Sequence, residues 1–129
     1  MLARAGRWRV SGLWKPELRV FIYSEAIDMR AGFGKLQALV AEKMKGKLFE
    51  GQLFLFLGKN RRRVKLLRFD GTGLCLFTKR LDRGLFMEVS DLFGVREIAM
   101  EELERLLDGA NLRVVFAARS RSRENQEVA

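Results

Sequence analysis

Three apolar runs between residues 52 and 79, separated only by short polar links, constrain the fold of this chain more than any other feature. They read QLFLFL at 52–57, VKLLRF at 64–69 and LCLFTK at 74–79. Runs of this length, rich in β-branched and aromatic residues or bounded by turn residues, are typical of β-strands. The link DGTG at 70–73 has the glycines that tight hairpin turns favour. The sequence therefore predicts an antiparallel β-meander.

Further elements flank the meander on both sides. The pattern predicts a strand at 18–23, a helix over 29–45 with Asp28 as its N-cap and Gly46 as its stop, and a short strand at 85–89. A short helix at 100–109, ended by Gly109, and a last strand at 112–116 complete the prediction. We expect an α+β fold: a mostly antiparallel meander packed by one longer helix, with a short C-terminal helix.

The length of the chain suits one domain. It has 129 residues, of which 48% are hydrophobic, enough to form a core. We expect a single α+β domain over 17–117. Residues 1–16 are predicted to be a flexible basic extension, and residues 118–129 a disordered polar tail.

Positive charge is concentrated in residues 59–83. Nine basic side chains against two aspartates give this stretch a net charge of +7, within a chain of net charge +9. The basic residues alternate with apolar runs, so folded structure is expected to present them. They are Lys59, Arg61, Arg62, Arg63, Lys65, Arg68, Lys79, Arg80 and Arg83. A field this concentrated favours a polyanionic partner, most simply a nucleic acid.

Within this stretch, the KNRRR turn at 59–63 is the part that points most specifically to phosphate binding. Arginine suits phosphate because its planar guanidinium binds two oxygens at once and stays charged. A hairpin tip with three successive arginines is therefore predicted to contact the DNA backbone. The structural alternative is a solvated turn whose charges keep the sheet from pairing with other edges.

The residues that common catalytic sites need are scarce. The sequence has no histidine, which excludes Ser-His and Cys-His nucleophile pairs and imidazole zinc ligands. Cys75 lies in an apolar run and is interpreted as a small core residue. A metal-dependent nuclease would have to draw on carboxylates that already have local structural roles, namely Asp28, Asp70, Asp82 and Glu88. We therefore expect no catalytic set, no metal site and no cofactor.

Nothing in the sequence suggests a membrane. No run reaches the roughly 18 apolar residues of a membrane-spanning helix, and the N-terminal residues lack the apolar segment of a secretory signal. We expect the cytoplasm as the location.

Two long stretches, DMRAGFGKLQALV and GQLFLFLGKNRRRVKLLRFDGTGLCLFTKRLDRGLF, carry a family resemblance. They resemble the TnpB accessory proteins, the second open reading frame products, of the insertion-sequence-sixty-six family. The resemblance covers about residues 18–110. Its motif residues include Asp28, Arg30, Asp70, Gly71 and Gly73.

The resemblance implies a role in DNA transposition beside a larger protein that supplies the strand-transfer chemistry. The expected function is a non-catalytic accessory factor that binds transposon DNA, or that DNA together with the transposase, through the basic hairpin face. An adaptor whose basic face docks an acidic surface of the transposase remains the alternative. A metal-dependent nuclease using Asp28, Asp70 and Asp82 is the third hypothesis.

Overall fold

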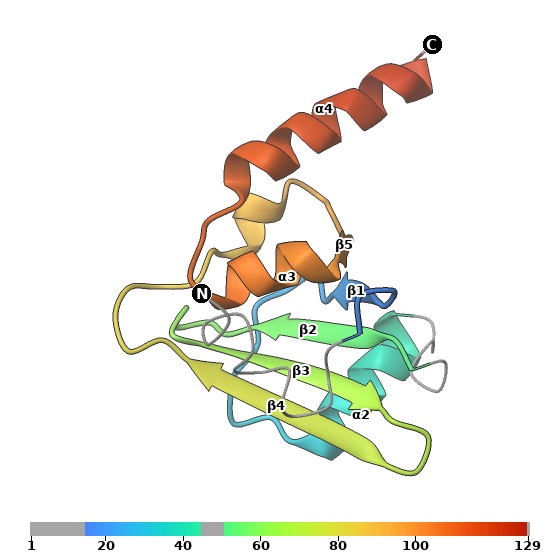
Figure 1. The fold of residues 1–129 in the computed structure, drawn as a ribbon, viewed down its shortest axis with the longest axis vertical. Helices are drawn as coiled ribbons and strands as arrows, with labels where there is room; N and C mark the ends of the chain where they lie inside the picture. Colours follow the sequence, from blue (N-terminus) through green and yellow to red (C-terminus); the bar gives the residue numbers. More distant parts are fainter. Residues whose placement is uncertain (1–14, 45–50, 129) are drawn as a thin grey trace.

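A five-stranded sheet runs through the part of the chain that the computed structural model describes, residues 15–44 and 51–128. Figure 1 labels its elements. The strands are β1 (Arg19–Ile22), β2 (Leu53–Leu57), β3 (Arg63–Phe69), β4 (Leu74–Arg80) and β5 (Glu97–Ala99). The helices are α2 (Phe33–Lys43), the 3-10 helix η3 (Val89–Leu92), α3 (Met100–Leu107) and α4 (Arg113–Val128).

The predicted meander is confirmed. Strands β2, β3 and β4 are antiparallel neighbours, and the sheet order is β4-β3-β2-β1-β5. Strand β1 lies between β2 and β5, parallel to β2 and antiparallel to β5. The fold is thus α+β with a mostly antiparallel sheet. The pairing with β5 closes a sequence separation of about eighty residues, which local patterns do not reveal.

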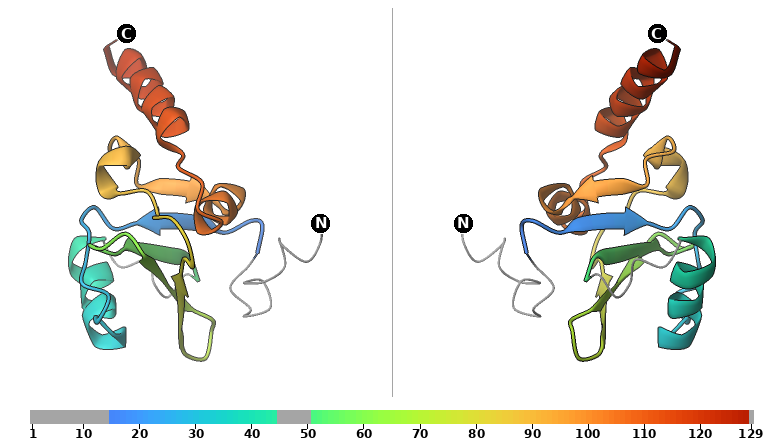
Figure 2. Two further views of the ribbon diagram at one scale, coloured as in Figure 1. Left: turned by 90° about the vertical axis from the view of Figure 1, so that its left-hand side faces the viewer. Right: turned by 90° about the vertical axis from the view of Figure 1, so that its right-hand side faces the viewer.

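Helices cover both faces of the sheet, so there are two cores. On one face, Leu36 and Val40 of α2 pack against Phe54 and Phe56 of β2. On the other face, α3 packs against the alternate residues of the same strands. Figure 2 shows α2 on one side of the sheet and α3 on the other. All five residues of β2 are buried, as expected for a central strand that is covered twice.

Helix α2 begins later than predicted. Its N-cap is Gly32, and Asp28 is not the cap. The Asp28 carboxylate instead accepts a hydrogen bond from the backbone N–H of Arg30 at 2.9 Å, which forms a local turn ahead of the helix. The helix ends at Lys43, and the predicted stop, Gly46, lies outside the described residues.

The two other strand predictions are wrong. Residues 85–88 form an irregular segment leading into η3, whose first turn is fixed by reciprocal hydrogen bonds between Glu88 and Asp91. Residues 113–128 form α4, so the strand at 112–116 does not exist. The Asn111 side chain accepts a hydrogen bond from the N–H of Arg113 and so caps this helix.

The predicted short C-terminal helix is present, and a further helix that was not predicted follows it. The short helix expected at 100–109 is α3, and the longer α4 follows it. The stretch expected as a disordered tail continues α4 as far as Val128. The basic extension falls almost entirely outside the described residues, so it and the domain limits stay predictions. Within the described residues, no helix combines the length and the apolar content needed to cross a membrane.

Gly58, where β2 ends, provides the first test of this fold. A Cβ atom there would lie 2.7 Å from the Arg63 carbonyl oxygen and 2.8 Å from Cγ of Met29. Because the first contact is with backbone, Gly58→Ala is expected to lower the free energy of unfolding by about 1–3 kcal/mol, the usual cost of overpacking. Urea denaturation measures the loss. Gly34→Ala is the control, since nothing lies within 4 Å of a Cβ at Gly34; an equal loss in both variants would contradict the packing.

Candidate nucleic-acid interface

The turn between β2 and β3 is held in place by backbone and side-chain hydrogen bonds. The N–H of Gly58 donates to the Arg63 carbonyl at 3.1 Å, and the N–H of Arg61 donates to the Gly58 carbonyl at 3.0 Å. Asn60 accepts a hydrogen bond from the N–H of Arg62 through its side-chain oxygen at 3.0 Å. Arg61 adopts φ 62°, a left-handed conformation that is uncommon for arginine. The turn is therefore an ordered platform for its arginines.

A second loop, residues 81–86, is hydrogen-bonded to this turn through the backbone. The N–H of Leu81 donates to the Arg62 carbonyl at 3.0 Å, and the N–H of Phe86 donates to the Arg61 carbonyl at 2.7 Å. Gly84, at φ 77°, allows the loop to reverse between these two anchors. The two loops lie side by side at one end of the sheet.

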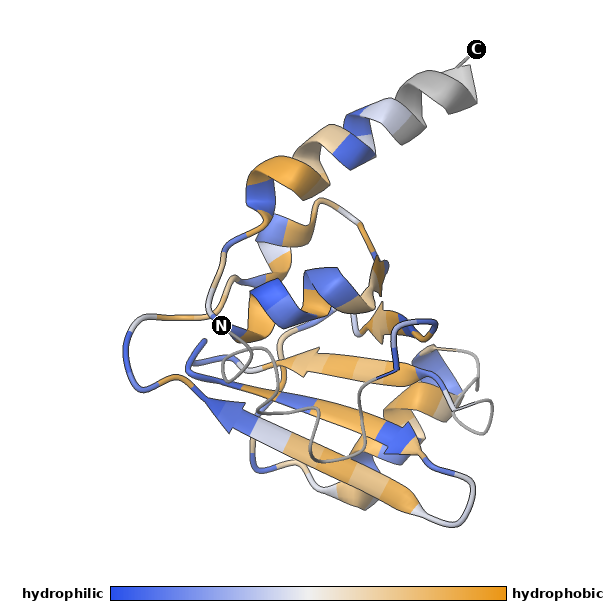
Figure 3. Ribbon diagram, in the orientation of Figure 1, coloured by the Kyte–Doolittle hydropathy of each residue, from blue (hydrophilic) through white to orange (hydrophobic). Residues whose placement is uncertain are grey.

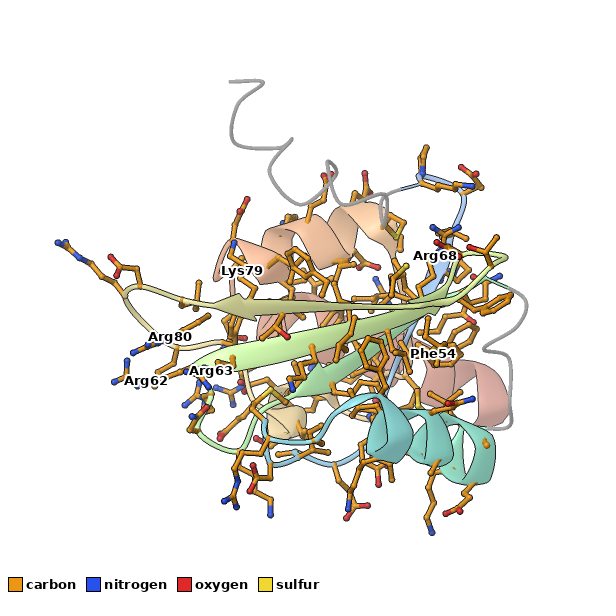
Figure 4. The ribbon with its side chains drawn as sticks, turned by 90° about the horizontal axis from the view of Figure 1, so that it is seen from below. Phe54, Arg62, Arg63, Arg68, Lys79 and Arg80 are labelled. Atoms are coloured by element: carbon orange, nitrogen blue, oxygen red, sulfur yellow. The ribbon has the colours of Figure 1, made fainter. Side chains whose placement is uncertain are left out.

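Five of the nine predicted basic residues are exposed on these loops and the strand ends that join them. We call this surface the basic edge; its members are Lys59, Arg62, Arg63, Arg80 and Arg83. No member forms an ion pair within the described part of the chain. Figure 4 shows Arg62, Arg63 and Arg80 together at this end of the sheet. The exposed Asp82 is the acidic residue of loop 81–86, leaving an excess of positive charge.

The alignment of β3 with β4 sets two of these cations opposite each other. Arg63 and Arg80 are cross-strand partners in the antiparallel register. Like charges directly opposite on neighbouring strands destabilise a sheet. The protein thus keeps a repulsive pair at the centre of its basic edge, a local conflict of the kind that binding sites often contain. Figure 3 shows the contrast between this hydrophilic end of β4 and the apolar middle of the sheet.

The structure assigns the other four predicted residues to internal contacts. Arg61 donates through Nε to the Phe86 carbonyl at 2.9 Å, and Lys65 donates through Nζ to the Ala31 carbonyl at 2.7 Å. Arg68 donates to the Gly51 carbonyl at 3.0 Å, and its side chain lies at the opposite end of the sheet from the basic edge (Figure 4). Lys79 faces α3, where its ammonium is 3.9 Å from Asp108. The nine residues therefore do not form one continuous face.

Arg68 offers a test of whether a basic residue with an internal contact stabilises the fold and does not bind DNA. The residue is only 7% exposed and its guanidinium holds the segment that precedes β2. Arg68→Ala is expected to cost about 1–3 kcal/mol of unfolding free energy, from the lost hydrogen bond and the lost packing of its stem. Thermal and urea unfolding measure this loss. Affinity for DNA, measured well below the melting temperature, should stay within about twofold of the parent. If Arg68 did contact a phosphate, its removal would lower the affinity several-fold. A marked drop in affinity at unchanged stability would instead place Arg68 in the interface.

The family-motif acids occupy two separate turns. Arg30 donates through Nε and a terminal nitrogen to the Asp28 carboxylate at 2.7–3.1 Å, which holds the pKa of Asp28 well below its usual range. Asp70 closes the β3–β4 turn, where hydrogen bonds from the backbone of Thr72 and Gly73 lower its pKa to about 2. Gly71, with φ 106°, completes this turn. Both carboxylates thus stabilise their local turns by accepting hydrogen bonds.

Asp28 and Asp70 lie too far apart to share the two cations of a two-metal nuclease. Asp28 follows Ile27, which bridges to Gly58 before β3, whereas Asp70 follows the end of β3. A seven-residue strand separates these positions by about 20 Å. Among the described residues, no three acidic or cysteine side chains converge as metal ligands. Cys75 is half-buried, and burial followed by its contact with Asp70 raises the pKa of its thiol.

The Asp28–Arg30 pair lies next to the basic edge. Together with Lys35 and Lys59, it borders an open hollow of about 470 Å³ beside the start of α2. The N–H of Lys59 donates to the Ile27 carbonyl at 2.9 Å, so the motif loop and the basic turn are joined directly. The loop that carries Asp28 and Arg30 is therefore bonded directly to the turn that presents the cations.

Comparison with known proteins assigns this sequence to a family. The family described as "IS66 Orf2 like protein" matches residues 18–117. The uncharacterized protein y4hO of Sinorhizobium fredii (strain NBRC 101917 / NGR234) is 42% identical over 96 residues, covering 74% of this chain and 84% of the relative. A second protein of that strain, y4jC, is 30% identical over 92 residues, covering 71% and 79%.

No solved structure matches significantly. The family match spans the sheet, α2, α3 and the first turn of α4, and it includes both loops of the basic edge and both motif turns. The resemblance noted in the sequence is therefore confirmed. This chain belongs to the IS66 Orf2-like family, the transposition-associated accessory proteins of IS66 elements.

Proposed function

We propose that this chain is a non-catalytic accessory factor in IS66 transposition that binds duplex DNA through phosphate contacts at the basic edge. The observation that carries the proposal is the repulsive pair Arg63 and Arg80, opposite each other and beside Arg62. An anionic backbone lying between these guanidiniums would replace the repulsion with charge-assisted hydrogen bonds. The strand-transfer chemistry is left to the transposase of the same element, which we propose as the partner on that DNA.

The shape of the basic edge favours backbone contact over base reading. Its cations come from two short loops and two strand ends at the border of the sheet, and α2 and α3 lie over the two faces. Base reading in the major groove usually requires an inserted helix or β-ribbon. Phosphate contacts position a protein on a duplex without selecting its sequence. We therefore propose modest dependence of the affinity on DNA sequence.

A salt titration tests this proposal. Neutralising five phosphates predicts that log Kobs falls with log[salt] with a slope of about −4 to −5, so that affinity drops about 10²–10³-fold between 50 and 200 mM salt. The measurement is fluorescence anisotropy of a labelled duplex of transposon-end sequence and of a scrambled duplex. Absence of binding to both at the lowest salt would overturn the proposal and leave the adaptor hypothesis. Affinity independent of salt would exclude the phosphate mechanism.

A further inference from the structure

Strand β4 forms one edge of the sheet, at its lower border in Figure 1, along its whole length of seven residues. Its register with β3 is unbroken from Leu74 to Arg80, so no bulge twists the edge away. The strand contains no proline, and its two charged residues, Lys79 and Arg80, stand together at one end. Open edges pair with other strands, and proteins usually prevent this with short strands, bulges, prolines or charges. The opposite edge strand, β5, has three residues, whereas residues 74–78 of β4 have none of these protections.

The backbone groups of alternate β4 residues point away from β3. At one end of the strand pair the N–H of Leu81 donates to the Arg62 carbonyl at 3.0 Å, and at the other end the N–H of Asp70 donates to the Gly73 carbonyl at 3.0 Å. Hydrogen-bonded residue pairs alternate with non-bonded pairs between antiparallel strands, so these two bonds fix the pattern along β4. The N–H and C=O groups that point outward are those of Leu74, Leu76, Thr78 and Arg80. Within the described residues, β3 is the only strand that pairs with β4.

The apolar side chains of this edge are incompletely covered. Residues 74–77 are each half-buried, whereas Leu66 and Leu67, which lie opposite Phe77 and Leu76 on β3, are completely buried. Phe77 packs at the margin of the core beneath α3, and Leu76 at the margin of the core beneath α2. A further strand beside β4 would cover these side chains on both faces of the sheet and would bond the outward backbone groups.

We propose that two copies of this chain pair through β4 in antiparallel orientation, which joins their sheets across a two-fold axis. The register that pairs all seven residues sets Phe77 opposite Phe77 of the second copy and Leu74 opposite Arg80. It also sets Leu76 opposite Thr78, so the outward backbone groups of the two strands meet in hydrogen-bonded pairs. The two phenylalanine rings lie side by side on the α3 face, and aromatic pairs of this kind stabilise neighbouring strands.

The distribution of charge along β4 favours a second copy as the occupant of the edge. In the antiparallel register, the basic end of each strand lies against the apolar end of the other, so no cation stands opposite a cation. The turn next to that apolar end carries Asp70, whose pKa of about 2, lowered by hydrogen bonds from Thr72 and Gly73, keeps it ionised. Each basic end therefore lies beside a negative turn of the other copy, while Asp70 keeps its hydrogen bonds.

The pairing separates the two basic edges. The Arg80 residues of the two copies are six positions apart along the joined strands, which is about 20 Å at 3.3 Å per residue. Because the strands run in opposite directions, the two basic edges lie at opposite ends of the joined sheet. The pair thus presents two separate cationic surfaces.

A proline at position 78 tests the backbone pairing. Thr78→Pro removes an N–H that points away from β3, so the folded monomer loses no hydrogen bond, and edge strands tolerate proline at such positions. Sedimentation equilibrium from about 1 µM to 1 mM, which spans the affinities of weak and standard interfaces, should show a dimer of the parent protein. Thr78→Pro should raise the dimer dissociation constant at least about tenfold, because the two-fold axis removes the hydrogen bond twice. Thr78→Ala keeps the N–H and should stay within about threefold of the parent.

Disulfide cross-linking tests the register. In a Cys75→Ala background, Phe77→Cys sets two thiols opposite each other in a non-hydrogen-bonded pair, with Cα atoms about 4.5 Å apart. This separation suits a disulfide, so oxidation should convert the dimer into a covalent one. Thr78→Cys in the same background is the matched control. Its two thiols stand two residues out of register, with Cα atoms more than about 7 Å apart, and should not form a disulfide.

A parent protein that stays monomeric over the whole concentration range would overturn the proposal and leave the edge for a strand of another protein, such as the transposase. Equal dissociation constants for Thr78→Pro and the parent would overturn it too, as would equal cross-linking at positions 77 and 78. Circular dichroism melting checks that each variant is folded, and the cysteine variants decide the question if the proline variant is not. Because these measurements contain no DNA, a failure here would leave the proposed DNA contact untouched.

Discussion

Simultaneous replacement of Arg62, Arg63 and Arg80 by alanine is expected to weaken binding to duplex DNA about 10²–10³-fold near 0.1 M salt. Each phosphate contact contributes close to one unit to the slope of log Kobs against log[salt], and three contacts are removed. The salt slope should fall by about 2.5–3. All three side chains are exposed, so the loss would come from the interface and not from the core.

The stability of the same variant should stay the same or rise slightly, although its affinity for DNA falls. Arg63 and Arg80 oppose each other across β3 and β4, and removal of this repulsion is expected to add roughly 0.2–1 kcal/mol. The expected result is therefore weaker binding in a protein that melts at the same or a slightly higher temperature. Few destabilising artefacts could produce that combination.

A matched triple variant removes equal charge elsewhere. Lys15→Ala, Lys43→Ala and Arg105→Ala replace three exposed cations that lie outside the basic edge. If net charge alone drove the association, this variant would bind as weakly as the first. We expect it to retain affinity within about fivefold of the parent, because only long-range attraction is reduced. Equal losses in both triples would contradict a localised interface.

The sequence predicted the meander because its signals are local. The apolar runs and the DGTG link each act within a few residues, and β2, β3 and β4 follow them closely. The α4 helix was missed because the β-branched residues of LRVVF favour strand locally. Asn111 was the signal in the other direction, since Leu112 and Phe116 are buried one helical turn apart behind an asparagine cap.

For the candidate site, the charge was predictable, but its distribution over the surface was predictable only in part. Alternation along β3 explains part of the difference: Arg68 shares the face of Val64 and Leu66, which is covered by α3, whereas Arg63 points to the other face. That period-two argument was available from the sequence. The roles of Arg61 and Lys65 were not, because their acceptors, Phe86 and Ala31, come from segments 25 and 34 residues away.

The largest loss of stability is expected at Phe54, in the centre of β2. Its side chain is completely buried in the core beneath α2, and its ring stacks on that of Phe21 with centroids 5.7 Å apart. Phe54→Ala is expected to lower the free energy of unfolding by about 3–5 kcal/mol, through lost burial and the cavity left behind. A domain of this size is stabilised by about 5–15 kcal/mol, so the variant approaches the limit of folding.

Two companion variants show which core the loss comes from. Phe54→Leu keeps most of the volume and should cost less than half as much as Phe54→Ala. Leu55→Ala removes a fully buried side chain from the core on the α3 side, with an expected cost of about 2–5 kcal/mol. Amide exchange in α2 should accelerate more in Phe54→Ala than in Leu55→Ala, and exchange in α3 should show the reverse. Identical exchange patterns in the two alanine variants would contradict this expectation. They would mean that the two cores, although separate in the structure, unfold together as one unit.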